Sequence, residues 1–263
     1  MVAFRRGTVR QALISVAQRL DAIEARRTSQ HAELVGVLRT ARPASALEHS
    51  DFPAAFLQHH ELVKPFALAS IERDYALYES VRYVVAADIP GDIVECGVWA
   101  GASSVLAALT LRSVGAHRRM WLYDTYGDFP HPGKNDEWYA GVPQESKPYE
   151  KAPTLDQVKA NMAQTGHEDV VYVEGPVEDT IPDTVPERIA LLRLDTDWYE
   201  STRHELEHLY PRLSDGGVLI IDDYGHFQGA RRAVDEYFQD QPVLLNRIDY
   251  TGRLLVKRAD SRH

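Results

Sequence analysis

From residue 92 to the C-terminus, short apolar runs typical of strands alternate with segments that have helical spacing. This alternation predicts an α/β fold with a doubly wound, mostly parallel sheet, because each crossover helix returns the chain to the same sheet. The predicted strands are 92–96, 120–123, 170–173, 189–194, 217–221, 244–248 and 253–257. The predicted helices are 102–111, 155–162, 201–209 and 230–238. Only a few residues join the last two strands, so these must be antiparallel, since a parallel pair needs a crossover.

The chain before this alternation is expected to be helical. Residues 52–87 form a predicted N-terminal helical cap on a domain that spans 52–263. Residues 1–43 carry apolar side chains four and three positions apart, which predicts an amphipathic helical arm with a short heptad stripe. The stripe includes Leu13, Val16, Leu20 and Ile23. The arm either packs on its own domain or joins subunits into a homo-oligomer such as a dimer, and the sequence leaves both open.

Composition argues against several classes of protein. The net charge of −10 disfavours a nucleic-acid groove, which needs a concentrated basic face. No apolar stretch is long enough to span a bilayer, and the N-terminus lacks the pattern of a signal peptide. Cys96 is the only cysteine, so no disulfide can form within the chain. We therefore expect a cytoplasmic protein that binds neither nucleic acid nor membrane.

Two acidic pairs follow predicted strands near the C-terminal end of the chain. Asp195 and Asp197 follow the strand 189–194, and Asp222 and Asp223 follow the strand 217–221. Ligands of open α/β sheets bind beyond the carboxyl ends of the strands, so neighbouring strand ends would aim these carboxylates at one point. Packed carboxylates repel each other unless a cation offsets their charge, and oxygen ligands suit Mg²⁺, Mn²⁺ or Ca²⁺. The alternative is that these aspartates only cap helices and turns.

A glycine-containing turn follows the first strand. Gly97 and Gly101 allow a tight turn and the close approach of a ligand to the backbone. Ser103 and Ser104 can donate from the first turn of the next helix. The pattern is neither the G-x-G-x-x-G of hydride-transfer folds nor a phosphate-binding loop with Lys-Ser/Thr. By itself the turn is weak evidence for nucleotide binding.

Acidic residues at the ends of the first two strands favour an adenosyl cofactor. Glu95 would repel a pyrophosphate but attract a cationic group such as the amino group of S-adenosylmethionine. Asp124 ends the second strand, where it is placed to accept hydrogen bonds from both ribose hydroxyls. The third strand leads into a turn over 173–180 that is suited to line an adenine ring.

The stretch 126–153 is long, polar and rich in aromatic residues and proline. Loops of this length in a compact domain are usually functional lids or disordered segments. Aromatic side chains can hold a ligand and exclude water from it, so we expect a lid. The alternative is a mobile, solvated loop.

Four segments carry a resemblance to a known family. They are Pro-Gly-Asp-Ile-Val-Glu-Cys-Gly-Val-Trp-Ala-Gly (90–101), Asp-Thr-Tyr-Gly-Asp-Phe-Pro (124–130), Leu-Asp-Thr-Asp-Trp-Tyr-Glu-Ser-Thr (194–202) and Ile-Asp-Asp-Tyr-Gly (221–225). From about Phe52 the chain resembles the macrocin O-methyltransferases, which are Mg²⁺-dependent sugar O-methyltransferases of antibiotic biosynthesis that use S-adenosylmethionine. The resemblance implies a class I (Rossmann-like) methyltransferase fold.

The resemblance also implies roles for individual residues. Asp195, Asp222 and Asp223 match the ligands of Mg²⁺ (or Mn²⁺), and Asp197 matches the general base. The residues expected to bind the cofactor are Glu95, Cys96, Gly97, Val98, Trp99, Ser103, Ser104, Asp124, Val177, Glu178 and Asp195. In relatives, a polar or sulfur-containing stretch that contacts the cofactor stands where this chain has Phe-Ala-Leu-Ala-Ser over 66–70. His226 and His131 are alternative candidates for the base.

The expected function is metal-dependent transfer of a methyl group from S-adenosylmethionine to a sugar hydroxyl of a glycosylated natural product. A metal is useful because it lowers the pKa of a hydroxyl and orients it, and a carboxylate can then take the proton. Two alternatives remain: an O-methyltransferase of a phenol or catechol, and a non-catalytic module that binds the cofactor and assembles through the arm. The intact acidic residues argue against the module, which has no need of them.

Overall fold

The computed structural model describes residues 49–127, 133–136 and 152–259. The chain divides into two units, Met1–Phe52 and Pro53–His263, and the fold below is that of the second unit. The predicted arm over 1–43, His131 and most of the predicted lid lie outside the described residues. Among the described residues, no helix combines the length and the apolar character needed to cross a bilayer.

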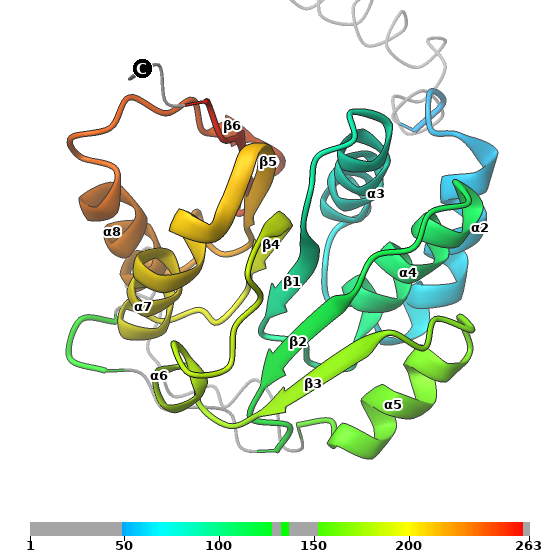
Figure 1. Cartoon of the computed structure of the whole chain (residues 1–263), viewed down its shortest axis with the longest axis horizontal. Coiled ribbons are helices and arrows are strands. Elements are labelled where there is room, and N and C mark those ends of the chain that lie inside the picture. Colours follow the sequence, from blue (N-terminus) through cyan, green and yellow to red (C-terminus); the bar gives the residue numbers. More distant parts are fainter. Residues whose placement is uncertain (1–48, 128–132, 137–151, 260–263) are drawn as a thin grey trace, which may run out of the picture. The chain divides into compact units, whose positions relative to one another are not determined.

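A seven-stranded sheet in the order β3-β2-β1-β4-β5-β7-β6 forms the centre of this unit (Figure 1). The strands are β1 Asp92–Cys96, β2 Met120–Asp124, β3 Val170–Glu174, β4 Ile189–Leu194, β5 Leu213–Ile221, β6 Asn246–Arg247 and β7 Arg253–Val256. The pairs from β3 through β5 are parallel, while β7 is antiparallel to both β5 and β6. The predicted sheet and its antiparallel last strand are confirmed.

Helices cover both faces of the sheet. They are α2 Ala54–Val63, α3 Ile71–Ala86, α4 Ala102–Ser113, α5 Leu155–Ala163, α6 Val177–Thr180, α7 Tyr199–Leu209 and α8 Gln228–Tyr237, with 3-10 turns at Lys64–Phe66 and Tyr210–Arg212. Buried residues of α2 to α5 pack in one cluster with the strands, and buried residues of α6 to α8 pack in another. Figure 1 shows these two helical layers on opposite sides of the strands.

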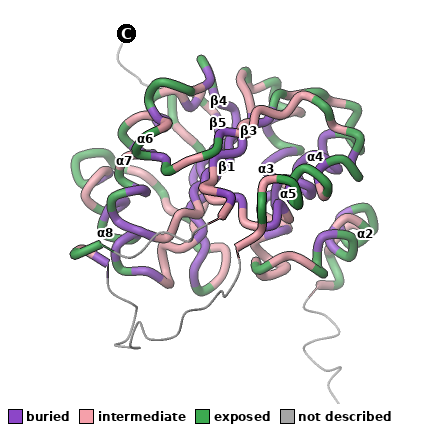
Figure 2. Tube along the Cα trace, turned by 90° about the horizontal axis from the view of Figure 1, so that it is seen from below, coloured by how far each residue is buried: buried purple, intermediate pink, exposed green. Residues whose placement is uncertain are grey.

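The core follows the strands because a parallel sheet covered on both faces is apolar on both faces. All six residues of β4, the middle strand, are buried, including Arg193. Figure 2 shows the same concentration of buried residues along the central strands, with the exposed residues on the outer helices. A buried arginine in this core requires nearby carboxylates, and the functional site supplies them.

Several elements differ from the predicted boundaries. β6 spans only two exposed residues instead of 244–248, because an edge strand gains little burial and pairs on one side only. β5 begins at Leu213 instead of residue 217, and α7 begins at Tyr199 instead of residue 201. The predicted turn over 173–180 contains the short helix α6. Apart from α6, which is an additional short helix, these differences lie at the ends of elements, where tertiary contacts decide the boundary.

The strand order reverses on either side of β1, which lies between β2 and β4. The carboxyl ends of β2, β1, β4 and β5 therefore meet at one edge of the sheet, where open α/β folds bind their ligands.

Candidate active site

The turn after β1 lies directly against the end of β4. A Cβ atom on Gly97 would lie 2.0 Å from the backbone oxygen of Asp195, and Gly97 has a φ of +81°. No other residue type fits this position, so the glycine allows the two strand ends to touch. Gly101, with a φ of +83°, then starts α4. The predicted cofactor turn and the first acidic pair are thus immediate neighbours.

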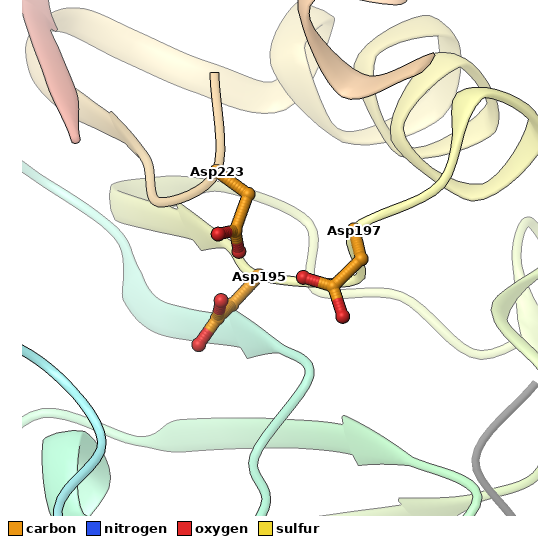
Figure 3. Close-up of side chains that lie close together, drawn as sticks. All are labelled: Asp195, Asp197 and Asp223. Carbon is orange, nitrogen blue, oxygen red and sulfur yellow. The ribbon is translucent and has the colours of Figure 1, made fainter. Parts of the chain in front are cut away.

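Three aspartates converge at this edge. Asp195 follows β4, Asp197 stands in the loop before α7, and Asp223 follows β5. One carboxylate oxygen from each lies within 4.8 Å of the others, and all three residues are half-buried. Figure 3 shows the three side chains close together at the ends of their strands and loop. We call this group, Asp195, Asp197 and Asp223, the acidic cluster.

Burial and mutual repulsion raise the pKa of each member of the acidic cluster. Burial is the largest cause for all three, and the neighbouring carboxylates add to it. The pKa of Asp197 rises to about 7, while the pKa values of Asp195 and Asp223 lie well above their ordinary range. Carboxylates held this close without a counter-charge favour protonation, and a bound cation would offset the same repulsion.

The backbone of Asp197 is in the left-handed region, with a φ of +68°. A residue other than glycine seldom adopts this conformation unless its surroundings hold it there, and such positions cluster at functional sites. The preceding Thr196 donates its hydroxyl to Glu205 of α7 at 3.1 Å. Glu205 is fully buried, and burial holds its pKa well above the ordinary value. The sequence pattern gave no indication of this support beneath the loop.

Arg193 connects three strand ends from inside the sheet. Its guanidinium donates to Glu95 of β1 at 2.8 Å, to Asp195 at 2.7 Å and to Asp222 at 2.7 Å. Glu95 is itself buried and also accepts the hydroxyl of Ser104. The carboxylate that the sequence predicts beside the cofactor amino group is therefore occupied by a structural ion pair. Buried ions are retained only when paired in this way.

Asp222 lies outside the acidic cluster. Besides Arg193, it pairs with Arg73 of α3, whose guanidinium also lies 3.2 Å from Asp249. Of the four acidic residues singled out in the sequence, the structure thus brings together Asp195, Asp197 and Asp223. It directs Asp222 toward two arginines that are distant in the chain.

The charges at this edge are unbalanced. Glu95, Asp222 and the acidic cluster contribute five carboxylates, whereas Arg73 and Arg193 contribute two guanidiniums, one of them shared with Asp249. A compact group of carboxylate oxygens with a deficit of positive charge fits a hard divalent cation such as Mg²⁺ or Mn²⁺.

Asp124 holds the glycine turn in place. Its Oδ2 accepts the backbone N–H groups of Val98 at 2.7 Å and Trp99 at 3.0 Å, and its Oδ1 accepts that of Tyr126 at 2.8 Å. The carboxylate predicted to bind ribose therefore ties the ends of β1 and β2 together. Trp99 is half-buried and has a φ of +51°.

The other predicted cofactor residues differ in exposure. Cys96, Ser103 and Ser104 are buried beneath the turn. In α6, Val177 is buried whereas Glu178 is exposed. The buried side chains lie beneath the turn, and the N–H groups of residues 97–99 already donate to Tyr123 and Asp124 within the protein. Contact with a ligand is therefore left to the other atoms of the turn and to the exposed side chains.

Asp136 is a residue of this region that sequence reasoning missed. It is buried, and its carboxylate accepts the backbone N–H of Tyr199, the first residue of α7, at 2.7 Å. It also accepts the N–H of Gly133 at 2.7 Å. In the sequence Asp136 is only an aspartate within a long loop, and nothing near it indicates that it contacts a helix about sixty residues later. His226, an alternative base, is half-buried beside Tyr250.

Comparison with known proteins places these features in a family. The profile of a family described as macrocin O-methyltransferase matches residues 62–257. An 8-demethyl-8-(2,3-dimethoxy-alpha-L-rhamnosyl)-tetracenomycin-C 4'-O-methyltransferase of Streptomyces olivaceus is 38% identical over 70% of this chain and 73% of its own length. A demethyldecarbamoylnovobiocin O-methyltransferase of Streptomyces niveus is 33% identical over 65% of this chain and 66% of its own length.

Solved structures agree with this result. The structure of the O-methyltransferase NovP superimposes with a TM-score of 0.65 and 30% sequence identity, covering 74% of this chain and 83% of that one.

Proposed function

The chain belongs to the macrocin O-methyltransferase family, and on this basis we propose that it transfers the methyl group of S-adenosylmethionine to a sugar hydroxyl of a glycosylated natural product. The observation that carries the proposal is the acidic cluster, which lies against the glycine turn at the carboxyl edge of the sheet. A cofactor at the turn and an acceptor at the cluster would be neighbours. The name of one relative refers to a rhamnosyl compound, in keeping with such an acceptor.

The backbone of residues 97–99 and the end of β2 would hold S-adenosylmethionine. Asp124 keeps this turn in one conformation through three backbone hydrogen bonds, so the cofactor would meet a site that is already formed. To bind the ribose as well, Asp124 would use the lone pairs that these donors leave. The cofactor supplies an electrophilic methyl group on its sulfonium sulfur.

A divalent cation, Mg²⁺ or Mn²⁺, is part of the proposal. Asp195 and Asp223 would hold it, since they belong both to the acidic cluster and to the ligand set expected from the sequence. Asp222, the third expected ligand, would join them only by giving up its pairing with Arg73, Arg193 or both. When bound, the cation supplies positive charge that acidifies and orients a hydroxyl group.

Asp197 would act as the general base. In the reaction the sugar oxygen forms a bond to the methyl carbon while the bond from that carbon to sulfur breaks, which leaves S-adenosylhomocysteine. The hydroxyl proton passes to the carboxylate of Asp197, which the left-handed backbone and Thr196 hold at the edge of the cluster.

The reaction class can be tested with a panel of acceptors. Purified enzyme is supplied with S-adenosylmethionine, Mg²⁺ and one acceptor at a time: p-nitrophenyl glycosides of rhamnose, fucose and glucose, and the phenolic acceptors catechol and caffeate. Mass spectrometry then detects the methylated product. We expect methylated glycosides and unchanged phenols. Turnover of the phenols alone would assign a phenolic acceptor, and cofactor binding without turnover of any acceptor would favour the non-catalytic module.

A further inference from the structure

Four aromatic rings form a row beside the acidic cluster. The rings of Trp198 and Phe227 are 5.1 Å apart at 68°, and those of Phe227 and His226 are 4.7 Å apart at 82°. The rings of His226 and Tyr250 follow at 5.9 Å and 76°. Edge-to-face packing of this kind is the favoured geometry for aromatic pairs. We call these four residues the aromatic row.

The inner end of the aromatic row lies at the proposed reaction centre. Trp198 directly follows Asp197 in the chain, and the backbone N–H groups of His226 and Phe227 both donate to the backbone oxygen of Asp223 at 3.0 Å. Trp198 and Phe227 are buried, with exposed fractions of 7% and 8%, whereas Tyr250 is 59% exposed. The row therefore leads from two members of the acidic cluster to an exposed ring.

The turn that carries Tyr250 is firmly fixed despite its exposure. Asp249 Oδ1 accepts the N–H groups of Thr251 at 2.9 Å and Gly252 at 2.6 Å. Thr251 donates its hydroxyl to the backbone oxygen of Asp222 and accepts the N–H of Gly225, both at 2.9 Å. These bonds join the turn between β6 and β7 to the loop that contains Asp223.

The turn is packed directly against the loop that contains Asp223, so it cannot move closer to that loop. A Cβ atom on Gly225 would lie 2.0 Å from the backbone oxygen of Tyr250, so the two backbones are in direct contact. The phenol hydroxyl of Tyr250 lies 3.3 Å from Nδ1 of His226, which orients the ring. An exposed aromatic ring with a fixed backbone and orientation binds a partner at little cost in conformational entropy.

We propose that Tyr250 is an acceptor-binding residue, whose ring stacks against the apolar C–H face of a sugar ring of the substrate. This inference rests on the proposed function, because it assumes a glycosylated acceptor at the acidic cluster. A pyranose ring has one face of C–H groups and a rim of hydroxyls, so a flat aromatic surface beside a cluster of carboxylates matches both parts of it. The aromatic row would form the wall along which that sugar approaches Asp197.

Three variants test this role. Tyr250→Ala removes the ring, and Tyr250→Phe keeps the ring but loses the hydroxyl. Tyr83→Ala is the matched control, because Tyr83 of α3 is also an exposed tyrosine, with an exposed fraction of 41%. Its hydroxyl lies near Gly216, in the first half of β5, whereas Asp222 follows the other end of that strand. The probe is whichever p-nitrophenyl glycoside the wild-type enzyme methylates fastest. KM is measured for this glycoside and for S-adenosylmethionine, and thermal melting confirms folding.

In Tyr250→Ala the KM for the glycoside should rise about tenfold, or about 1.4 kcal/mol, while the KM for S-adenosylmethionine stays within about twofold. Tyr250→Phe should recover most of the lost acceptor affinity, and Tyr83→Ala should change neither KM. An unchanged acceptor KM in Tyr250→Ala overturns the inference, as does a rise in the KM for S-adenosylmethionine alone. Turnover of phenols but of no glycoside by the wild-type enzyme would defeat the proposed function itself, and the inference with it.

Discussion

At the scale of single residues, the site depends on carboxylates that the fold holds in unfavourable surroundings. Asp197 combines a left-handed backbone with a half-buried carboxylate whose neighbours are also acidic. Glu205 lies in the core with one oxygen, Oε1, that lacks a hydrogen-bond partner. Both arrangements cost stability, and such costs are usually retained where they serve a function.

Replacing Asp197 tests its role as the base. Asp197→Asn keeps the size of the side chain and removes its basicity, so kcat should fall by about 10²–10⁴-fold while the KM for S-adenosylmethionine changes little. Calorimetry with Mn²⁺ should show cation affinity near that of the wild type. Asp222→Asn is the matched comparison and should weaken cation binding while sparing the affinity for S-adenosylmethionine. A near-normal kcat in Asp197→Asn would transfer the role to His226 or His131.

Glu205 predicts a pH dependence of stability. The unfolded chain releases the proton near the ordinary pKa of about 4.3, whereas burial holds the pKa of Glu205 well above that value in the folded protein. The folded state therefore keeps a proton that the unfolded state loses, and the stability from this group is present below about pH 4 and declines as the pH rises. Glu205→Gln lacks this decline.

Urea denaturation of the wild type and Glu205→Gln at pH 4 and pH 7 measures this effect. As the pH rises from 4 to 7, the free energy of unfolding of Glu205→Gln should increase relative to that of the wild type. A difference between the two proteins that does not depend on pH would contradict the prediction.

Sequence reasoning could find the acidic residues but not their partners. Asp195, Asp197 and Asp223 were identifiable because each follows a strand-like run, and strand ends of one sheet meet at one edge. The pairing of Asp222 with Arg73 spans 149 residues, and nothing in the local pattern of a helix indicates which face reaches that edge. Arg193 was equally hidden, since a single charged residue in an apolar run does not reveal its depth. Glu205 was hidden for another reason, because it is one of several charged residues in α7 and the pattern does not show which of them is buried.

At the scale of elements, the strands were predictable because their burial on both faces produces continuous apolar runs. The ends of the helices were less predictable. α7 begins at Tyr199, two residues before the predicted start, because Asp136 of the loop before α5 accepts the N–H of its first residue. A Cβ on Gly229 of α8 would lie 1.9 Å from Asp136 Oδ1, so this glycine leaves space for the carboxylate.

Removal of this cap should destabilise α7 and the loop together. Asp136→Ala loses both backbone hydrogen bonds and should lower the free energy of unfolding by about 1 kcal/mol or more. For a domain of this size that corresponds to a fall in Tm of about 2–4 °C. Asp136→Asn keeps an acceptor oxygen and should melt closer to the wild type. Equal melting temperatures for Asp136→Ala and the wild type would show that the cap does not contribute to stability.

At the scale of the whole molecule, the arm over 1–43 was predicted from its heptad stripe and lies outside the described residues. If the stripe at Leu13, Val16, Leu20 and Ile23 joins subunits, a chain that lacks the residues before Pro43 should have a lower mass in light scattering than the full chain. We expect a fall from dimer to monomer with the methyltransferase domain still folded. An unchanged mass would mean that the helix packs within its own subunit or is idle.

The central claim is that this chain methylates a sugar hydroxyl at a cation-dependent acidic cluster. Its most direct test is the initial rate of glycoside methylation after treatment with EDTA and after Mg²⁺ is added back in excess. The account predicts that EDTA abolishes turnover, that Mg²⁺ restores it, and that binding of S-adenosylmethionine changes little throughout. Full turnover in EDTA would contradict it.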